Sequence, residues 1–148
     1  HWRKFALWEE TTRIPMIWVA PGMTKPGTKC SQPVDTMSIY PTLCSLTGIK
    51  KPDHVSGHDI SALLQNPKAK WKHPAITTHG RGNHSVRTAN ERYIRYADGS
   101  EEYYDHTKDP YEWKNLAATS DLSRFKKWLP KKEVASQVLK KNSKKPKK

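Results

Sequence analysis

A single short apolar run, residues 16–20 (MIWVA), constrains the fold of this chain more than any other feature. Pro21 and Gly22 close the run, which is typical of a strand buried on both faces, as in a parallel sheet covered by helices. A buried parallel strand needs hydrogen-bonded neighbours, and no other stretch of the sequence has the same pattern. We therefore expect the neighbouring strands to come from elsewhere and the chain to be part of a larger α/β protein.

The charge of the chain is concentrated at one end. The 148 residues carry a formal charge of +13, which taken alone is typical of nucleic-acid binding. Residues 124–148 hold eleven Lys or Arg and one acid, a net +10, whereas residues 1–123 hold sixteen against thirteen, a net +3. Because the body is nearly balanced, only the tail is expected to attract polyanions. No apolar run approaches the roughly 20 residues of a membrane-spanning helix.

Two short helices are predicted in the first half of the chain. Asp35 is a good N-terminal cap for a helix that ends at Gly48, and Pro41 should bend this helix or divide it into two pieces. Asp59 caps a second helix, which ends at residues 66–67. The apolar residues expected to face the core are Met37, Tyr40, Leu43, Cys44 and Leu46 in the first helix and Ile60, Leu63 and Leu64 in the second.

The second half of the chain has the pattern of a small antiparallel sheet followed by a helix. A strong hairpin signal, Asp98-Gly99, separates two of the expected strands. The expected strands are residues 75–78, 85–88, 92–97 and 102–104. One face of a C-terminal helix is marked by Leu122, Phe125, Trp128 and Leu129, before Pro130. We also predict a short helix over residues 5–12, and a Lys-rich tail over 130–148 that is partly helical and then disordered.

The metal-binding residue types show no ligand pattern. Cys30 and Cys44 belong to no C-x-x-C pair, which argues against a structural zinc site, and either a single bridge or two free thiols is possible. Of the seven histidines, His54 and His58 fall in an expected loop, and the later ones form no i, i+4 pair. No bound metal is therefore predicted for this chain.

Seven motifs, ordered along roughly residues 1–117, resemble the formylglycine-dependent sulfatases of the alkaline-phosphatase-like superfamily. The first joins residues 2–5 (WRKF) to 9–15 (EETTRIP), and the last runs over 92–116 and resembles the family's "RYIRY…ELYD…DP.E..NL" close. Between them lie Pro21-Gly22, residues 33–35 (PVD), 40–43 (YPTL), Gly48-Ile49 and 57–64 (GHDISALL). Within the family, the chain looks most like the iduronate sulfatase and choline sulfatase branch.

This resemblance implies an α/β fold, the C-terminal part of an alkaline-phosphatase-like sulfatase. The implied elements are one buried strand plus helices, then a small antiparallel sheet and a C-terminal helix. Residues 1–72 would end the catalytic domain, 73–129 would form a C-terminal subdomain, and 130–148 would be the tail. The implied activity is hydrolysis of sulfate esters, of a sulfated glycan or a small organic sulfate, and the implied location is periplasmic or secreted.

The family's nucleophile and calcium ligands have no counterpart in the sequence. The nucleophile lies in C-x-P-S-R, whose Cys becomes formylglycine. Residues 30–34 (CSQPV) have a different Pro position and no Arg, so Cys30 is not expected to be the nucleophile. We expect Ca²⁺ only in the complete enzyme, with ligands outside this chain. The isolated chain is predicted to be inactive and to need the remainder of the catalytic domain as a partner.

One catalytic residue is implied by the resemblance. A Trp-x-Lys stretch in the family supplies a lysine that binds the sulfate ester, and the matching residue is Lys4. The resemblance also places the loop between the first two expected strands at the substrate pocket. The implied substrate contacts are His84 and Arg81 from this loop, with Trp2 and Phe5 beside Lys4 as pocket walls.

Two non-catalytic functions are the alternatives. Arg92-Tyr93-Ile94-Arg95-Tyr96 interleaves basic and aromatic residues, as single-strand nucleic-acid binders do. In a strand, however, Arg92, Ile94 and Tyr96 share one face while Tyr93 and Arg95 share the other, so no continuous platform results. We therefore do not expect nucleic acid as a partner of the body. A scaffold or polyanion-binding protein that uses the basic tail is the alternative to an enzyme.

Overall fold

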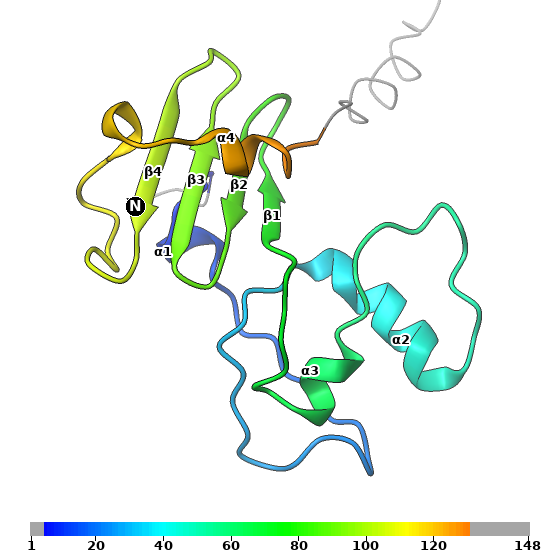
Figure 1. Cartoon of the computed structure of the whole chain (residues 1–148). Helices are drawn as coiled ribbons and strands as arrows, with labels where there is room; N and C mark the ends of the chain where they lie inside the picture. The colour runs from blue at the N-terminus through cyan, green and yellow to red at the C-terminus, as the bar shows by residue number, and fades with distance from the viewer. Residues whose placement is uncertain (1–4, 131–148) are drawn as a thin grey trace, which may run out of the picture. The chain divides into compact units, whose positions relative to one another are not determined.

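The computed structural model describes residues 5–130 of the chain (Figure 1). It divides into two compact units, each described here by itself. The first, termed the sheet unit, takes Ile76–Val86 with the described parts of His1–Thr12 and Glu91–Lys148. The second, termed the helical unit, takes Arg13–Ala75 and Arg87–Asn90. Lys4, Trp2 and the Lys-rich tail from residue 131 lie outside the described residues.

A four-stranded sheet forms the centre of the sheet unit, with its strands in sequence order. They are β1 (Ala75–Thr78), β2 (His84–Arg87), β3 (Glu91–Arg95) and β4 (Glu101–Asp105). Strands β3 and β4 are antiparallel, with Tyr93 opposite Tyr103. The turn between them is the predicted one: the Tyr96 N–H donates to the Ser100 carbonyl at 2.9 Å, and Gly99 adopts a φ of 88°. The predicted antiparallel sheet is confirmed.

One face of the sheet packs against α4 (Ser123–Lys126), which crosses it in Figure 1. Alternation along the strands brings Val86, Tyr93 and Tyr103 to this face. The buried residues that complete this core are Leu122, Phe125 and Leu129. The ring of Phe125 stacks on that of Tyr93, with centroids 5.5 Å apart. The predicted C-terminal helix is confirmed as a shorter element, preceded by η2 (Ala117–Thr119).

The opposite face of the sheet is covered by the N-terminal segment, residues 5–12. Leu7 is buried together with Ile94 and Tyr104, and Trp8 packs against them. Only Glu9–Thr12 (α1) are helical, so the predicted helix over 5–12 is shorter than expected. Thr12 donates its hydroxyl hydrogen to the Trp8 carbonyl at 2.9 Å, which closes this single turn. Residues more than eighty positions apart in the sequence therefore share one core.

The helical unit contains η1 (Thr36–Ser38), α2 (Ile39–Thr47) and α3 (Ser61–Gln65). Pro41 lies in the first turn of α2, where a missing N–H removes no intrahelical bond. The two helical pieces, η1 and α2, meet between Ser38 and Ile39. Gly48 ends α2 with a left-handed φ of 71°. The Asp59 carboxylate accepts from the Ser61 N–H at 2.8 Å at the start of α3. Both predicted helices are confirmed.

The predicted core face of α2 is wrong in part. Met37, Tyr40 and Leu43 are exposed, whereas the neighbouring Thr42 is fully buried. The Thr42 hydroxyl donates to the Ser38 carbonyl at 2.6 Å and accepts from the Ile60 N–H at 3.1 Å. Because this hydroxyl joins α2 to the start of α3, the helix turns its Thr42 side inward and leaves its more apolar side outward.

The strand predicted over residues 16–20 is not formed in the structure. Residues 13–20 have no regular secondary structure, and Ile17 and Val19 are 86% and 85% exposed. The side chains do alternate, because Met16, Trp18 and Ala20 are half-buried. A strand also requires a hydrogen-bonded neighbour, and within residues 5–130 none pairs with this run. The apolar pattern predicted burial that these residues alone do not supply.

Both cysteines are free thiols, Cys30 exposed and Cys44 buried, so the structure favours the unbridged alternative. Within residues 5–130, the structure has no helix with the length and apolar character to cross a membrane.

Candidate functional site

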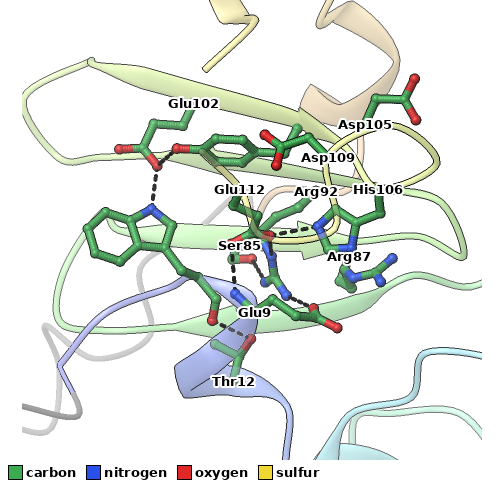
Figure 2. Close-up of polar contacts among 12 residues, drawn as sticks. Glu9, Thr12, Ser85, Arg87, Arg92, Glu102, Asp105, His106, Asp109 and Glu112 are labelled. Carbon is green, nitrogen blue, oxygen red and sulfur yellow. Dashed lines mark hydrogen bonds and ion pairs between the residues drawn. The ribbon is translucent and has the colours of Figure 1, made fainter. Parts of the chain in front are cut away.

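A buried arginine joins the N-terminal segment to the sheet (Figure 2). Arg92 on β3 is 2% exposed, and each nitrogen of its guanidinium has a partner. Nε donates to the Glu112 carboxylate at 2.5 Å, and Nη2 pairs with the carboxylate of Glu9. Nη1 donates to the Leu7 carbonyl at 2.9 Å and to the Ser85 hydroxyl at 2.7 Å. We term Arg92, Glu9 and Glu112 the arginine clamp.

The sequence places a charge on this buried face because Arg92 and Ile94, two positions apart on β3, point to the same side of the sheet. A buried guanidinium is costly unless it is paired and hydrogen-bonded, and two carboxylates meet that need here. The Glu112 carboxylate has two further partners, the backbone N–H of Glu9 at 2.8 Å and Nε2 of His106 at 2.7 Å. The clamp is thus a closed polar network inside an apolar face.

Glu112 reaches the clamp from a loop with a shape of its own. Among the described non-glycine residues, only Glu112 has a left-handed φ, 58°, which is a conformation that L side chains rarely adopt. The loop is shaped by Asp109, whose carboxylate accepts from the Lys114 N–H at 2.8 Å; this bond lowers the pKa of Asp109. Tyr111 and Trp113, on either side of Glu112, are exposed and stack on each other with centroids 5.3 Å apart. The rare backbone conformation of Glu112 thus accompanies a side chain that points inward to Arg92.

A second anchor holds the N-terminal segment at β4. Trp8 donates its indole N–H to the Glu102 carboxylate at 2.6 Å. The same carboxylate accepts from the hydroxyls of Tyr104 at 2.9 Å and Tyr96 at 3.2 Å. Burial, followed by the interactions with Glu102, raises the pKa of Tyr96 to about 12 and that of Tyr104 further still. These tyrosines therefore stay protonated as donors near neutral pH.

The residues predicted as substrate contacts are placed unevenly. Phe5 is 73% exposed and stacks on His79 of the β1–β2 loop, with ring centroids 5.2 Å apart. Arg81 is exposed in the same loop. His84 is buried in β2, where its Nδ1 lies 2.8 Å from the Thr78 hydroxyl oxygen. The structure therefore brings Phe5 to the loop that carries Arg81, and holds the His84 ring inside the sheet unit.

The residues present do not fit the family's calcium ion. Within residues 5–130, one group of side chains has potential ligand atoms all within 4.8 Å of one another: Glu9, His106 and Glu112. The Arg92 guanidinium already pairs with both carboxylates. Calcium takes six to eight oxygen ligands, which this set does not offer. No step of the chemistry is assigned to a metal held by the described residues.

The sequence pattern alone did not single out the clamp, although its members lie in three of the quoted stretches. Glu9 belongs to EETTRIP, Arg92 to RYIRY and Glu112 to the DP.E element. The available signal was the alternation that puts Arg92 on the same face as Ile94, since a charge on a buried face demands partners. The identity of those partners depends on tertiary contacts.

The fold and the site define a mixed α/β protein in which an N-terminal segment is anchored to a four-stranded antiparallel sheet. The chain belongs to the sulfatase family described as "N-sulphoglucosamine sulphohydrolase, C-terminal", which matches residues 1–138.

Known sulfatases resemble this chain over most of its length. It is 39% identical over 132 residues to a "Sulfatase" of Formosa agariphila, covering 86% of this chain and 26% of that protein. It is 33% identical over 141 residues to the "Delta 4,5-hexuronate-2-O-sulfatase" of Bacteroides thetaiotaomicron, covering 83% and 28%. The solved structure of "Ps i-CgsB" is 18% identical with a TM-score of 0.54 over 73% of this chain and 27% of that one, which concerns the fold alone. The chain spans about a quarter of the length of the curated relatives it matches.

Proposed function

We propose that this chain is the C-terminal part of a sulfatase that hydrolyses sulfate esters, and that it contributes a sulfate-binding lysine and a wall of the substrate pocket. The observation that supports this most is the family match over residues 1–138, which includes the WRKF and EETTRIP stretches at the start of the chain. Residues 7–9, which lie between these two stretches in the sequence and reach into the second, are bound to the sheet through Arg92.

Lys4 is the proposed catalytic residue. A sulfate monoester is anionic, and its transition state moves negative charge onto the bridging oxygen. An ammonium group beside that oxygen favours both substrate binding and departure of the leaving group. Trp2 and Phe5 would form the pocket wall beside it. The exposed Phe5 ring on the β1–β2 loop supports a pocket edge that also includes Arg81, with His84 as a further candidate contact.

The remaining proposals follow the family. The formylglycine nucleophile and Ca²⁺ would be supplied by the remainder of the catalytic domain, because the described residues fit neither role. The substrate would be a sulfated glycan, which the hexuronate-sulfatase relative supports, or a small organic sulfate. The complete enzyme would be periplasmic or secreted. The boundaries at residues 72 and 129 and the iduronate or choline sulfatase branch stay predictions.

The test is to compare this chain with the complete enzyme expressed from the gene that encodes it. The complete enzyme should hydrolyse an aryl sulfate, and its activity should depend on Ca²⁺ and on the formylglycine cysteine. The isolated chain should give no turnover under the same conditions. Robust turnover by the isolated chain, or none by the complete enzyme on aryl and glycan sulfates, would contradict the proposal.

The polyanion-binding alternative has no support in the described part of the chain. Arg92 is buried in the clamp, and Arg95 lies opposite Glu101 in the β3–β4 register. The acids Glu102 and Asp105 lie on the same strand as Glu101. The strand that interleaves basic and aromatic residues is therefore neutralised by its neighbour.

A further inference from the structure

We propose that Arg92, together with Glu9 and Glu112, is a positioning device: by fixing residues 7–9, it controls how Lys4, three positions earlier in the sequence, acts on the sulfate ester. This rests on the proposed function, because it takes Lys4 to be the sulfate-binding residue. Arg92 itself is a positioning residue, since its contacts are with the N-terminal segment and the sheet.

The first support is the density of polar contacts on a very short segment. Three consecutive residues of the N-terminal segment, 7–9, are tied to the sheet unit. The Leu7 carbonyl and the Glu9 carboxylate both bind Arg92, and the Glu9 N–H binds Glu112. Trp8, between them, binds Glu102 on β4. Main chain and side chains are thus both fixed, which a packing role for one apolar residue would not require.

The second support is the geometry of the guanidinium. Its planar fork directs donors along fixed directions, and here they reach Glu112, Glu9 and the Leu7 carbonyl at once. The Ser85 hydroxyl on β2 holds the same Nη1 from the sheet side. A lysine, as a point charge with a flexible stem, would not set the distance and rotation of the segment in this way. The arginine therefore specifies a position rather than only a charge balance.

The third support is the short distance along the chain between the clamp and the proposed catalytic residue. Only Phe5 and Ala6 lie between Lys4 and Leu7, whose carbonyl is bound by Arg92. An error of about 1 Å in the position of a reacting group lowers the rate by about 100-fold. The left-handed φ of Glu112 belongs to the same device, because that conformation accompanies the inward placement of its carboxylate. Loosening the clamp should therefore act on catalysis through Lys4.

The test is a double-mutant cycle in the complete enzyme, with kcat and KM for an aryl sulfate as readouts. Arg92→Lys should lower kcat/KM by about 10- to 100-fold when Lys4 is present, mainly through kcat, because a misplaced ammonium still attracts the anion. In the Lys4→Ala background the same change should cost less than about 2-fold, because the two residues act in series. Glu9→Gln, which keeps the side-chain shape and is expected to fold, should give the same pattern with a smaller loss.

The matched control is Arg124→Gln. This exposed arginine pairs with Glu91 on β3 and approaches the Tyr103 hydroxyl, on the face of the sheet opposite the clamp. Its loss should change kcat/KM by less than about 2-fold in either background.

Three results would overturn the proposal. Equal losses from Arg92→Lys and Glu9→Gln with and without Lys4 would show a purely structural role, since a smaller folded fraction lowers both backgrounds alike. Unchanged activity in both variants, beside a large loss in Lys4→Ala, would overturn the positioning role and leave the proposed function intact. No loss in Lys4→Ala itself would overturn the role of Lys4 in the proposed function, and the positioning role with it.

Discussion

A single buried charge decides how the N-terminal segment meets the sheet. Removing one partner from a buried ion pair leaves an uncompensated charge and costs about 3–5 kcal/mol in typical proteins. Arg92 has two carboxylate partners, and one of them, Glu112, also binds His106. Substitution of any member of this network is therefore expected to destabilise the fold. Glu9→Gln is the mildest such change, and for that reason it is the most informative about catalysis.

Gly57 has the most demanding position among the described glycines. Its φ of 98° is left-handed, and a Cβ built on it would lie 2.1 Å from the Met37 carbonyl oxygen. That neighbour is backbone at η1, so it cannot swing aside as a side chain would. Glycine at this position lets the loop before α3 approach η1 within the helical unit.

We predict that Gly57→Ala destabilises the protein far more than Gly48→Ala. Gly48 also has a positive φ, 71°, but a Cβ there would meet nothing within 4 Å, so only the conformational cost of about 1–2 kcal/mol applies. Gly57→Ala adds a backbone clash and should cost at least about 3 kcal/mol. Urea denaturation of the two variants measures the difference. Equal losses would show that the loop moves freely away from η1.

At the scale of elements, the β3–β4 pair is held by tyrosine hydroxyls donating to carboxylates. Tyr93 donates to Glu101 at 2.5 Å, and Tyr103 donates to Glu91 at 2.7 Å. Burial, followed by these hydrogen bonds, raises the pKa of Tyr103 to about 12 and that of Tyr93 further. The bond from Tyr93 also lowers the pKa of Glu101.

The raised pKa of these tyrosines predicts a loss of stability in alkali. A group with a folded pKa above its unfolded value stabilises the fold fully below the unfolded pKa, here 10, and loses this effect as pH rises through the folded pKa. Unfolding free energy should therefore fall between pH 10 and about pH 12. The double variant Tyr96→Phe, Tyr103→Phe should show a shallower fall over that range in urea denaturation followed by circular dichroism. An identical dependence of the unfolding free energy on pH in the two proteins would show that Tyr96 and Tyr103 do not cause the loss.

Local sequence patterns predicted the elements that depend on contacts within a few residues. Asp98-Gly99 fixed the hairpin, and Gly48 fixed the end of α2, because both depend on backbone conformations within a few residues. The strand over residues 16–20 was wrong because strand formation depends on a partner that the run does not contain. The exposed Met37 and Tyr40 were also missed, because the buried hydroxyl of Thr42 decides which side of α2 turns inward.

At the scale of the whole molecule, the site joins residues that lie far apart in the sequence. The bonds from Arg92 to Glu9 and to the Leu7 carbonyl span 83 and 85 positions, and the bond from the Glu9 N–H to Glu112 spans 103. No periodicity or spacing rule reaches over such distances. The order of the motifs predicted the family, and the resemblance to that family implied a role for Lys4, whereas the arginine clamp became visible only in the fold.

The proposed role of the start of this chain in a sulfatase active site is tested most directly at Lys4. The measurement is kcat/KM for an aryl sulfate with the complete enzyme, its Lys4→Ala variant and, as a control, Lys126→Ala. Lys126 is an exposed lysine paired with Glu101, and its helix α4 packs on the face of the sheet opposite the N-terminal segment, so the control removes the same charge elsewhere in the molecule. Lys4→Ala should lose about 100- to 1,000-fold and Lys126→Ala less than about 2-fold. Equal activity of the two variants would contradict the account.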